Sequence, residues 1–202
     1  MQPTTVQTNW KVFLIFVLGD VCAVGGLYII YGYVPNNKSG IAPAALLALL
    51  GMGSTCGRLF FTLLFNNQTP SPSVKPLVLM SLVIGAAAIM PLLFALPSPT
   101  NSIVLALVLT LSLLPFSYIL GGLTGIWISG SSTILANLLE EPKQSTGFAL
   151  LTCLRGIVAL LIPIGTLKLA KIKVIPSLLC FISSGLFGLS ALLFAMANFF
   201  YN

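Results

Sequence analysis

Residues 41–65 read IAPAALLALLGMGSTCGRLFFTLLF, an apolar run that contains one arginine, Arg58. A membrane-spanning helix needs about 20 apolar residues, and an arginine near its middle costs roughly 2.5 to 3.5 kcal/mol on insertion scales. On a helix, the residues that share the face of Arg58 are small or polar: Gly51, Ser54, Thr55 and Thr62. The run therefore predicts a membrane helix whose polar stripe faces a protein interior or a water-filled path.

The composition of the whole chain agrees with a membrane location. The chain has 202 residues, of which 57% are hydrophobic and only 6% are charged, and its mean hydropathy is +1.08. These values exclude an ordinary water-soluble domain. Six apolar segments are long enough to cross a bilayer: 12–34, 41–65, 76–97, 103–138, 146–167 and 174–198. We expect an all-α integral membrane protein in which residues 1–202 form a single bundle of six transmembrane helices.

The segment 103–138 is longer than one membrane crossing requires. At 1.5 Å a residue it would extend about 54 Å, against about 30 Å for the hydrocarbon core. It is either one long helix or two helices that break at Gly121-Gly122. The break has no polar loop residues, and a turn in lipid would leave backbone groups unpaired. We therefore predict one long, tilted helix. The predicted connections are too short for an extramembrane domain: 35–40, 66–73, 97–102, 140–146 and 168–173.

The charged residues are few and mostly lie in the predicted connections. Nine lysines and arginines against three acids give a net charge of +6, without a basic patch, so nucleic acid binding is not expected. The positive-inside rule does not decide the orientation. One face of the membrane receives Lys11, Lys75 and Lys143, and the other receives Lys38, Lys168, Lys171 and Lys173.

The chain lacks the residues that most enzymatic and metal sites use. It contains no histidine, so Ser54 has no imidazole base, and one embedded aspartate cannot form an aspartyl dyad. We expect neither enzymatic activity, nor a cofactor, nor a metal site. The four cysteines contain no CxxC pair and are interpreted as small packing residues: Cys22, Cys56, Cys153 and Cys180.

Three ionisable residues lie inside predicted spans: Asp20, Arg58 and Arg155. At 1.5 Å a residue they lie about 12, 10 and 14 Å from the same membrane face, and thus at one level. Because the first two spans are antiparallel neighbours, an ion pair between Asp20 and Arg58 is geometrically open and leaves Arg155 as a site for an anion. Two alternatives stay open: the arginines reach lipid headgroups instead, or Asp20 is protonated, which would indicate proton coupling.

Glycines and prolines provide a second signal in the spans. Gly121, Gly122 and Gly125 lie close together in the fourth span, where small residues allow either close helix packing or a solute path. Prolines at three positions inside spans are expected to bend their helices: Pro91, Pro115 and Pro163.

Several of these stretches resemble the monocarboxylate transporter branch of the major facilitator superfamily. The second span, with AALL at 44–47, LGMG at 50–53 and GRLF at 57–60, resembles that family's eighth helix. The fifth span, with TGFALL at 146–151 followed by LRGI, ALL and Pro163, is similar to its eleventh helix. The fourth span, ending in ILANLL at 134–139, looks like its tenth. With spacing and connection lengths, the resemblance covers nearly the whole chain.

The resemblance implies the C-terminal six-helix half of a twelve-helix carrier for small organic anions, with the substrate between the two halves. Arg58 matches the arginine that meets the substrate carboxylate, and Ser54, Thr55 and Arg155 are further candidates for substrate binding. Ser54 stands where proton-coupled members have an aspartate, so Asp20 would have to supply that function from the neighbouring helix.

Two functions follow from these observations. The first is a carrier, or half of one, for monocarboxylate-type substrates, which works as a symporter by rocking two bundles against each other. The second is a truncated, non-transporting membrane protein that pairs with or regulates a full-length carrier. The expected partners are the lipid bilayer, a small carboxylate, and an N-terminal six-helix half, a second copy or a single-span accessory protein. The expected location is the plasma membrane.

Overall fold

The computed structural model describes residues 9–33, 43–66, 76–94, 103–171 and 176–201, and its regular secondary structure within them is helical. Five of its helices are long and apolar enough to cross a membrane, so the chain is an all-α, multi-pass membrane protein. The six helices are α1 (Trp10–Tyr33), α2 (Pro43–Asn66), α3 (Pro76–Phe94), α4 (Ile103–Leu138), α5 (Glu141–Lys171) and α6 (Pro176–Tyr201).

The third predicted span is the one that length and composition support least. Within the described residues α3 has 19 residues, and its apolar part, Leu77–Leu92, is shorter than the other candidate spans. Residues 95–97 of the predicted span lie outside the described residues, as do the predicted connections 35–40 and 97–102. The prediction of six membrane-crossing helices is therefore supported for five of them.

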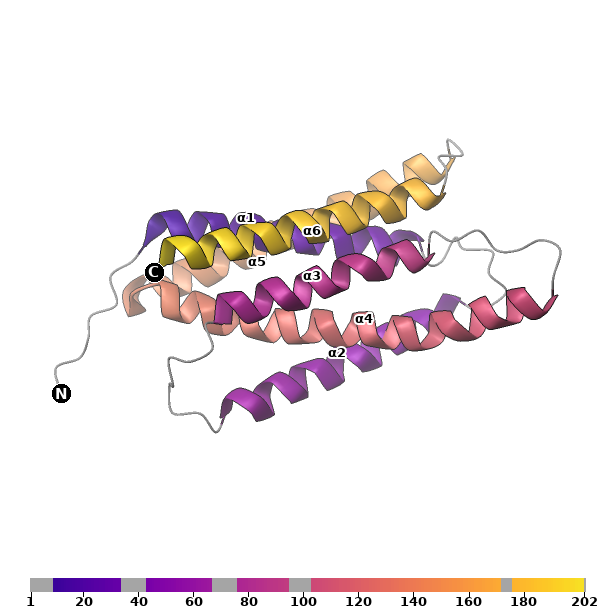
Figure 1. Cartoon of the computed structure of the whole chain (residues 1–202). Coiled ribbons are helices and arrows are strands. Elements are labelled where there is room, and N and C mark those ends of the chain that lie inside the picture. The colour runs from indigo at the N-terminus through magenta and orange to yellow at the C-terminus, as the bar shows by residue number, and fades with distance from the viewer. Residues whose placement is uncertain (1–8, 34–42, 67–75, 95–102, 172–175, 202) are drawn as a thin grey trace.

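The fourth span is one continuous helix, as predicted. α4 has 36 residues and runs through both Gly121-Gly122 and Pro115 without a break. In Figure 1 its first turns project beyond the ends of the neighbouring helices. The sequence around the glycine pair has no polar loop residues, and this is typical of a continuous helix, because a break there would leave backbone groups unpaired in lipid.

The predicted connection at 140–146 is wrong, because α5 begins at Glu141, close behind the end of α4. The backbone N–H groups of Lys143 and Gln144 donate to the carbonyl of Glu140, at 2.8 and 3.1 Å. The side-chain amide of Gln144 donates to the carbonyls of Ala136 and Leu139, which satisfies groups at the end of α4. The polar residues of this segment thus form the first turn of a helix instead of a loop.

The helices lie roughly along one common axis, and successive helices run in alternate directions (Figure 1). Both ends of the described chain therefore lie at the same end of the bundle. The most extensive packing joins α2 with α4, α1 with α6 and α3 with α6. α1 also packs on α5, and α3 on α4, while α4 touches α5 and α1 more sparingly. α1 is the most deeply buried of the candidate spans, whereas α2 joins the bundle mainly through α4.

This set of helix pairs has an internal symmetry. Exchanging α1 with α4, α2 with α5 and α3 with α6 converts every well-packed pair into another well-packed pair, apart from the smaller contact of α4 with α5. Each set contains three helices, so the second set runs through the bundle in the direction opposite to the first (Figure 1). Within the described residues, the pattern of helix pairs is thus the one expected of two three-helix repeats of inverted topology.

A glycine seam, which consists of Gly53, Gly57, Gly121 and Gly125, joins α2 to α4. A Cβ atom added at Gly57 would overlap the carbonyl of Gly122, and one added at Gly121 would overlap the carbonyl of Leu50. The two backbones therefore approach more closely than any larger residue would allow. The structure assigns Gly121 and Gly125 to helix packing, one of the two interpretations that the sequence left open.

Serine side chains tie α6 to its two neighbours. Ser183 donates to the carbonyl of Gly26 on α1, and Ser184 donates to the carbonyl of Ala88 on α3, at 2.8 and 2.6 Å. In return, Ser81 of α3 donates to the carbonyl of Ala191 at 2.8 Å. These bonds satisfy polar groups inside an apolar interior, where an unpaired hydroxyl would be costly.

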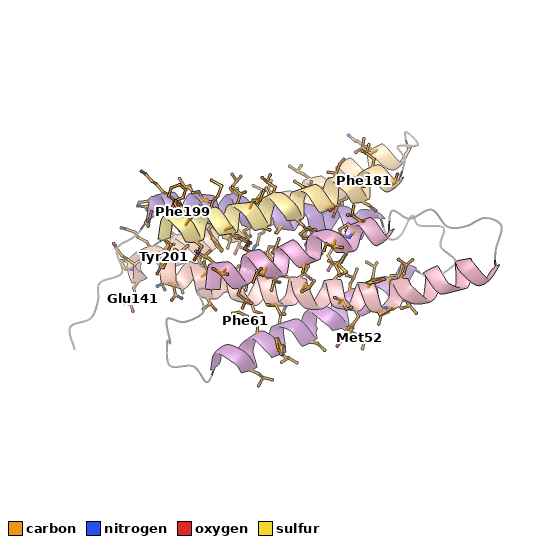
Figure 2. The ribbon with its side chains drawn as sticks, viewed as in Figure 1. Met52, Phe61, Glu141, Phe181, Phe199 and Tyr201 are labelled. Carbon is orange, nitrogen blue, oxygen red and sulfur yellow. The ribbon has the colours of Figure 1, made fainter. Side chains whose placement is uncertain are left out.

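Large apolar side chains cover the outside of the bundle. Figure 2 shows Phe181 and Phe199 on the outer side of α6, and both are more than half exposed. Leu14 and Leu18, one turn apart on α1, are equally exposed, while the opposite side of this helix belongs to the buried core. Such an apolar outer surface is what a helix bundle presents to lipid.

We predict that Gly57→Ala lowers stability by about 1 to 3 kcal/mol, because the new methyl group forces α2 away from α4. Gly51→Ala is the matched control, since an added Cβ there meets nothing within 4 Å. The control should unfold at the same temperature as the wild type or slightly higher, because alanine favours a helix. Thermal unfolding of the purified proteins in one detergent measures both. Equal melting temperatures for the two variants would contradict the seam.

Candidate functional site

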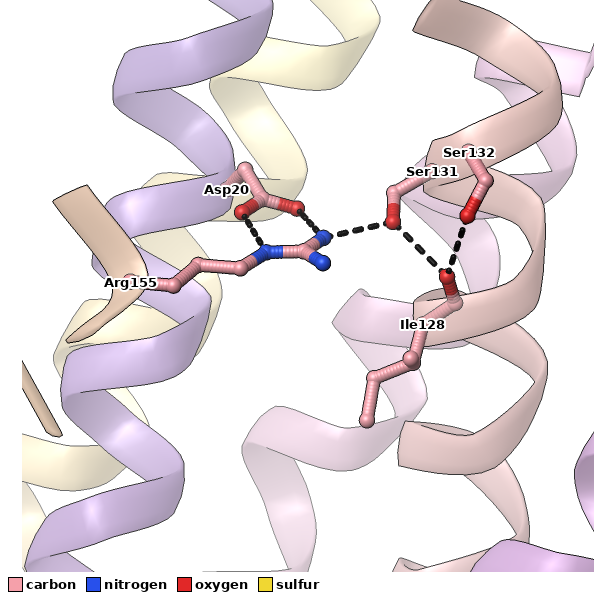
Figure 3. Close-up of polar contacts among 5 residues, drawn as sticks. All are labelled: Asp20, Ile128, Ser131, Ser132 and Arg155. Atoms are coloured by element: carbon pink, nitrogen blue, oxygen red, sulfur yellow. Dashed lines mark hydrogen bonds and ion pairs between the residues drawn. The ribbon is translucent and has the colours of Figure 1, made fainter. Parts of the chain in front are cut away.

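An ion pair in the middle of the bundle joins α1 to α5. Nε of Arg155 donates to Oδ2 of Asp20, and Nη2 donates to Oδ1, both at 2.7 Å. Figure 3 shows the guanidinium facing the carboxylate side-on, with two bonds between two planar groups. Asp20 is completely buried, whereas about a quarter of the Arg155 side chain is exposed. A bidentate pair of this kind is among the strongest polar contacts available to a protein.

The ion-pair partner of Asp20 is Arg155 and not the expected Arg58. An ion pair between Asp20 and Arg58 is wrong, because α2 packs on α4 and α1 packs on α5. Counting residues along each span gives the depth of a charged residue in the membrane, but it does not say which helices face each other. Arg155 is consequently not an unpaired arginine, since it holds the carboxylate of Asp20.

The pattern of α1 explains why Asp20 points inward. Phe13, Phe16, Ala23 and Leu27 are buried with it at helical spacing, and the lipid-facing side carries Leu14 and Leu18. The sequence thus places the acid on the core side of the most central helix. A carboxylate in that position requires a counter-charge, since burying it alone would cost several kcal/mol.

α4 contributes two residues that sequence reasoning did not identify, Ser131 and Trp127. The second N–H of Arg155 Nη2 donates to Oγ of Ser131, and Ser131 in turn donates to the carbonyl of Ile128 at 2.9 Å. The Arg155 Cζ lies 5.5 Å from the centre of the Trp127 ring, within the range of a cation–π contact. We name Asp20, Arg155, Ser131 and Trp127 the charged cluster; it joins α1, α4 and α5.

Arg155 has donors left over. A guanidinium carries five N–H groups, and three of those on Arg155 are engaged, which leaves both N–H groups of Nη1 without a described acceptor. The indole N–H of Trp127 is fully buried and lies close to the Asp20 carboxylate, as a donor from α4 beside those of Arg155. The unused N–H groups of Arg155 can therefore bind a further acceptor.

Arg58 is not part of the charged cluster. Its side chain is exposed, and among the described residues it has no ion-pair partner. Buried residues of α2 turn toward α4, namely Leu46, Leu50, Gly53, Gly57 and Phe61. The predicted polar stripe lies beside this packed face, so Arg58 and its small neighbours remain uncovered within the chain.

The other predicted substrate-binding residues have local roles in α2. Thr55 is exposed and donates its hydroxyl hydrogen to the carbonyl of Gly51 at 3.1 Å. Ser54 is partly buried, and its backbone carbonyl lies so close to Gly125 that a Cβ there would overlap it. Gly122 lies against Gly57 and belongs to the same packed interface. Only Arg58 and Thr55 of this group thus present side chains on the uncovered face.

The two arginines occupy corresponding positions of the two repeats. The tetrapeptide Thr-Cys-x-Arg occurs at 55–58 in α2 and again at 152–155 in α5, and the symmetry of the helix pairs relates α2 to α5. This repeated tetrapeptide is a signal in the sequence that could have shown that the arginines are equivalent. They differ in one respect: Arg155 has an acid beside it, whereas α4, on which α2 packs, contains no acidic residue.

The cysteines differ in burial. Cys180 is fully buried in the core, as expected of a packing residue, whereas Cys56 and Cys153 are exposed on α2 and α5. The interpretation of these two as residues packed inside the chain is therefore wrong. In the described part of the chain, no group of three or more cysteines and acids is close enough to hold a metal ion.

No family model matches the chain, and no curated protein or solved structure matches it.

We predict that Asp20→Ala and Arg155→Met each destabilise the protein by about 3 to 5 kcal/mol, because each leaves one buried charge unpaired. The double variant should be much less destabilised than the sum of the two, since no isolated charge remains. Unfolding of the four proteins in one detergent completes the double-mutant cycle. Additive losses would show that the two side chains do not stabilise each other.

Proposed function

We propose that this chain is a transmembrane carrier, or the C-terminal half of one, for small organic anions of the monocarboxylate type. The observation that carries the proposal is Arg58, an exposed guanidinium within a helix that is apolar enough to span a membrane. The charges of Asp20 and Arg155 cancel each other, whereas Arg58 is a positive charge well inside a span and has no ion-pair partner among the described residues. An anion is the ligand that such a position favours.

The chemistry of the guanidinium supports a carboxylate as that anion. It is planar and permanently charged, and it can donate two parallel hydrogen bonds to the two oxygens of a carboxylate. The pair of Arg155 with Asp20 provides an example of this geometry in the same chain. Thr55, which lies one turn before Arg58 on the exposed side of α2, can accept a further hydrogen bond from a substrate hydroxyl.

The inverted repeats support a carrier over a passive structural protein. Many carriers consist of such repeats and place their binding sites where the repeats meet, near the middle of the membrane. The prolines inside α3, α4 and α5 add positions at which these helices can bend. Rocking of this bundle against a second six-helix bundle, with the substrate between them, is the mechanism that we propose.

We predict that Arg58→Lys lowers carboxylate transport at least about tenfold, because an ammonium group cannot make the bidentate contact. Purified protein, alone and together with any N-terminal half from a longer parent chain, is reconstituted in liposomes. Uptake of labelled acetate, lactate and benzoate is then measured. Leu59→Ala, which changes an exposed apolar neighbour on the same helix, is the control and should transport like the wild type.

Unchanged transport by Arg58→Lys would show that carboxylate binding does not depend on this guanidinium. Absence of flux with the complete parent protein would contradict transport itself.

A second candidate function is a non-transporting protein that pairs with a full-length carrier. The exposed face of α5 favours it, because Gly156 and Gly165 have open space around them, and such small residues are typical of helix–helix contacts in membranes. Purification from native membranes in a mild detergent distinguishes the two. Recovery together with a full-length carrier, combined with no flux by the chain, would support pairing without transport.

A further inference from the structure

We propose that Arg155, Trp127 and Ser131 form a second carboxylate site, which Asp20 fills as an internal anion. A small free carboxylate would bind there whenever the side chain of Asp20 leaves it. This inference extends the proposed function to a second location and does not depend on Arg58 binding an anion.

The geometry around Asp20 is that of a bound carboxylate. Both of its oxygens are held by Arg155 at 2.7 Å, through Nε and Nη2, and the side chain is completely enclosed. Ser131 accepts the remaining N–H of Nη2 and thereby fixes the plane of the guanidinium (Figure 3). A free carboxylate in the same position would receive the same two parallel bonds.

A third donor lies beside the ion pair. The indole N–H of Trp127 is fully buried and lies close to the Asp20 carboxylate. A carboxylate in this position therefore meets donors from α4 as well as from α5, and a free anion would meet the same groups.

The internal repeat supplies an independent argument. Arg58 and Arg155 end the same tetrapeptide on equivalent helices, yet only Arg155 has an acid beside it. The first repeat thus contains an arginine that is open to an external anion, and the second contains the same arginine with an anion built into the neighbouring helix. Separation of α1 from α5 would turn the second position into a site of the first kind.

The size of the enclosed side chain limits the ligand. The part of Asp20 beyond its Cα is an acetate group in outline, and the surrounding helices enclose it completely. An Asp20→Ala variant keeps the Cβ atom and vacates only the space of the carboxylate, so formate matches this space, whereas acetate and benzoate are too large for it. This size limit distinguishes the site from the exposed surroundings of Arg58.

The test counts formate molecules bound by each chain, using equilibrium dialysis of detergent-purified protein with labelled formate. The wild type, Asp20→Ala, and the double variant Asp20→Ala/Arg155→Met are compared. We expect Asp20→Ala to bind one more formate than the wild type and the double variant to lose this gain. Labelled benzoate should show no gain in any variant.

The gain of one formate is expected whether the wild type binds one molecule or none, so the test separates this inference from the function proposed for Arg58. A count for Asp20→Ala equal to that of the wild type would overturn the second site, and so would a gain that persists in the double variant. If Asp20→Ala does not yield folded protein, it is expressed and purified with formate present, because a ligand that binds the folded state stabilises it. A yield of folded protein that formate does not raise again overturns the proposal.

Discussion

Burial of one carboxylate, that of Asp20, is the constraint on which the arrangement of the other helices depends. The most central helix carries this acid on its core side, where an isolated charge would cost several kcal/mol. Arg155 supplies the counter-charge and thereby determines which face of α5 turns toward α1 and at what level. Because α5 contributes few buried side chains of its own, the ion pair and its hydrogen bond to Ser131 define the position of α5 more sharply than apolar packing does.

The other half of the bundle is held by a different kind of contact. α2 packs on α4 through the glycine seam, where backbones touch without any charge. In lipid, close van der Waals packing of this kind replaces the hydrophobic effect as a source of helix association. One consequence is that the two equivalent helices differ in function: α5 uses its arginine to join the bundle, whereas α2 joins through glycine and leaves its arginine available.

The sequence predicts the helices well and their neighbours poorly. Apolar runs of sufficient length mark the helices, and the lack of polar residues at Gly121-Gly122 correctly indicates that α4 is continuous. Polar residues at 140–146 predict a loop where the structure has a helix start, because helix caps and loops share the same residue types. The depth of a charge follows from counting residues, but its partner does not, since adjacency in the chain favours α2 as the neighbour of α1, whereas α1 packs on α5 and α6. The spacing of Gly53 with Gly57 and of Gly121 with Gly125 contains the missing information, because each pair forms a small surface that fits another of its kind.

The length of α4 has a consequence for the membrane in which the protein resides. Its 36 residues extend about 54 Å, and even a tilt of about 40° leaves about 41 Å along the membrane normal, more than the roughly 30 Å of an average hydrocarbon core. Because hydrophobic mismatch costs a fraction of a kcal/mol for each ångström, a thick, sterol-rich bilayer accommodates this helix at a lower cost than a thin one. The part of α4 from Leu113 to Leu138 has 26 residues and extends about 39 Å, so at a tilt of about 40° it fits a core of about 30 Å. In an average bilayer α4 therefore has to tilt, and its first turns extend past the ends of the other helices on one side only (Figure 1).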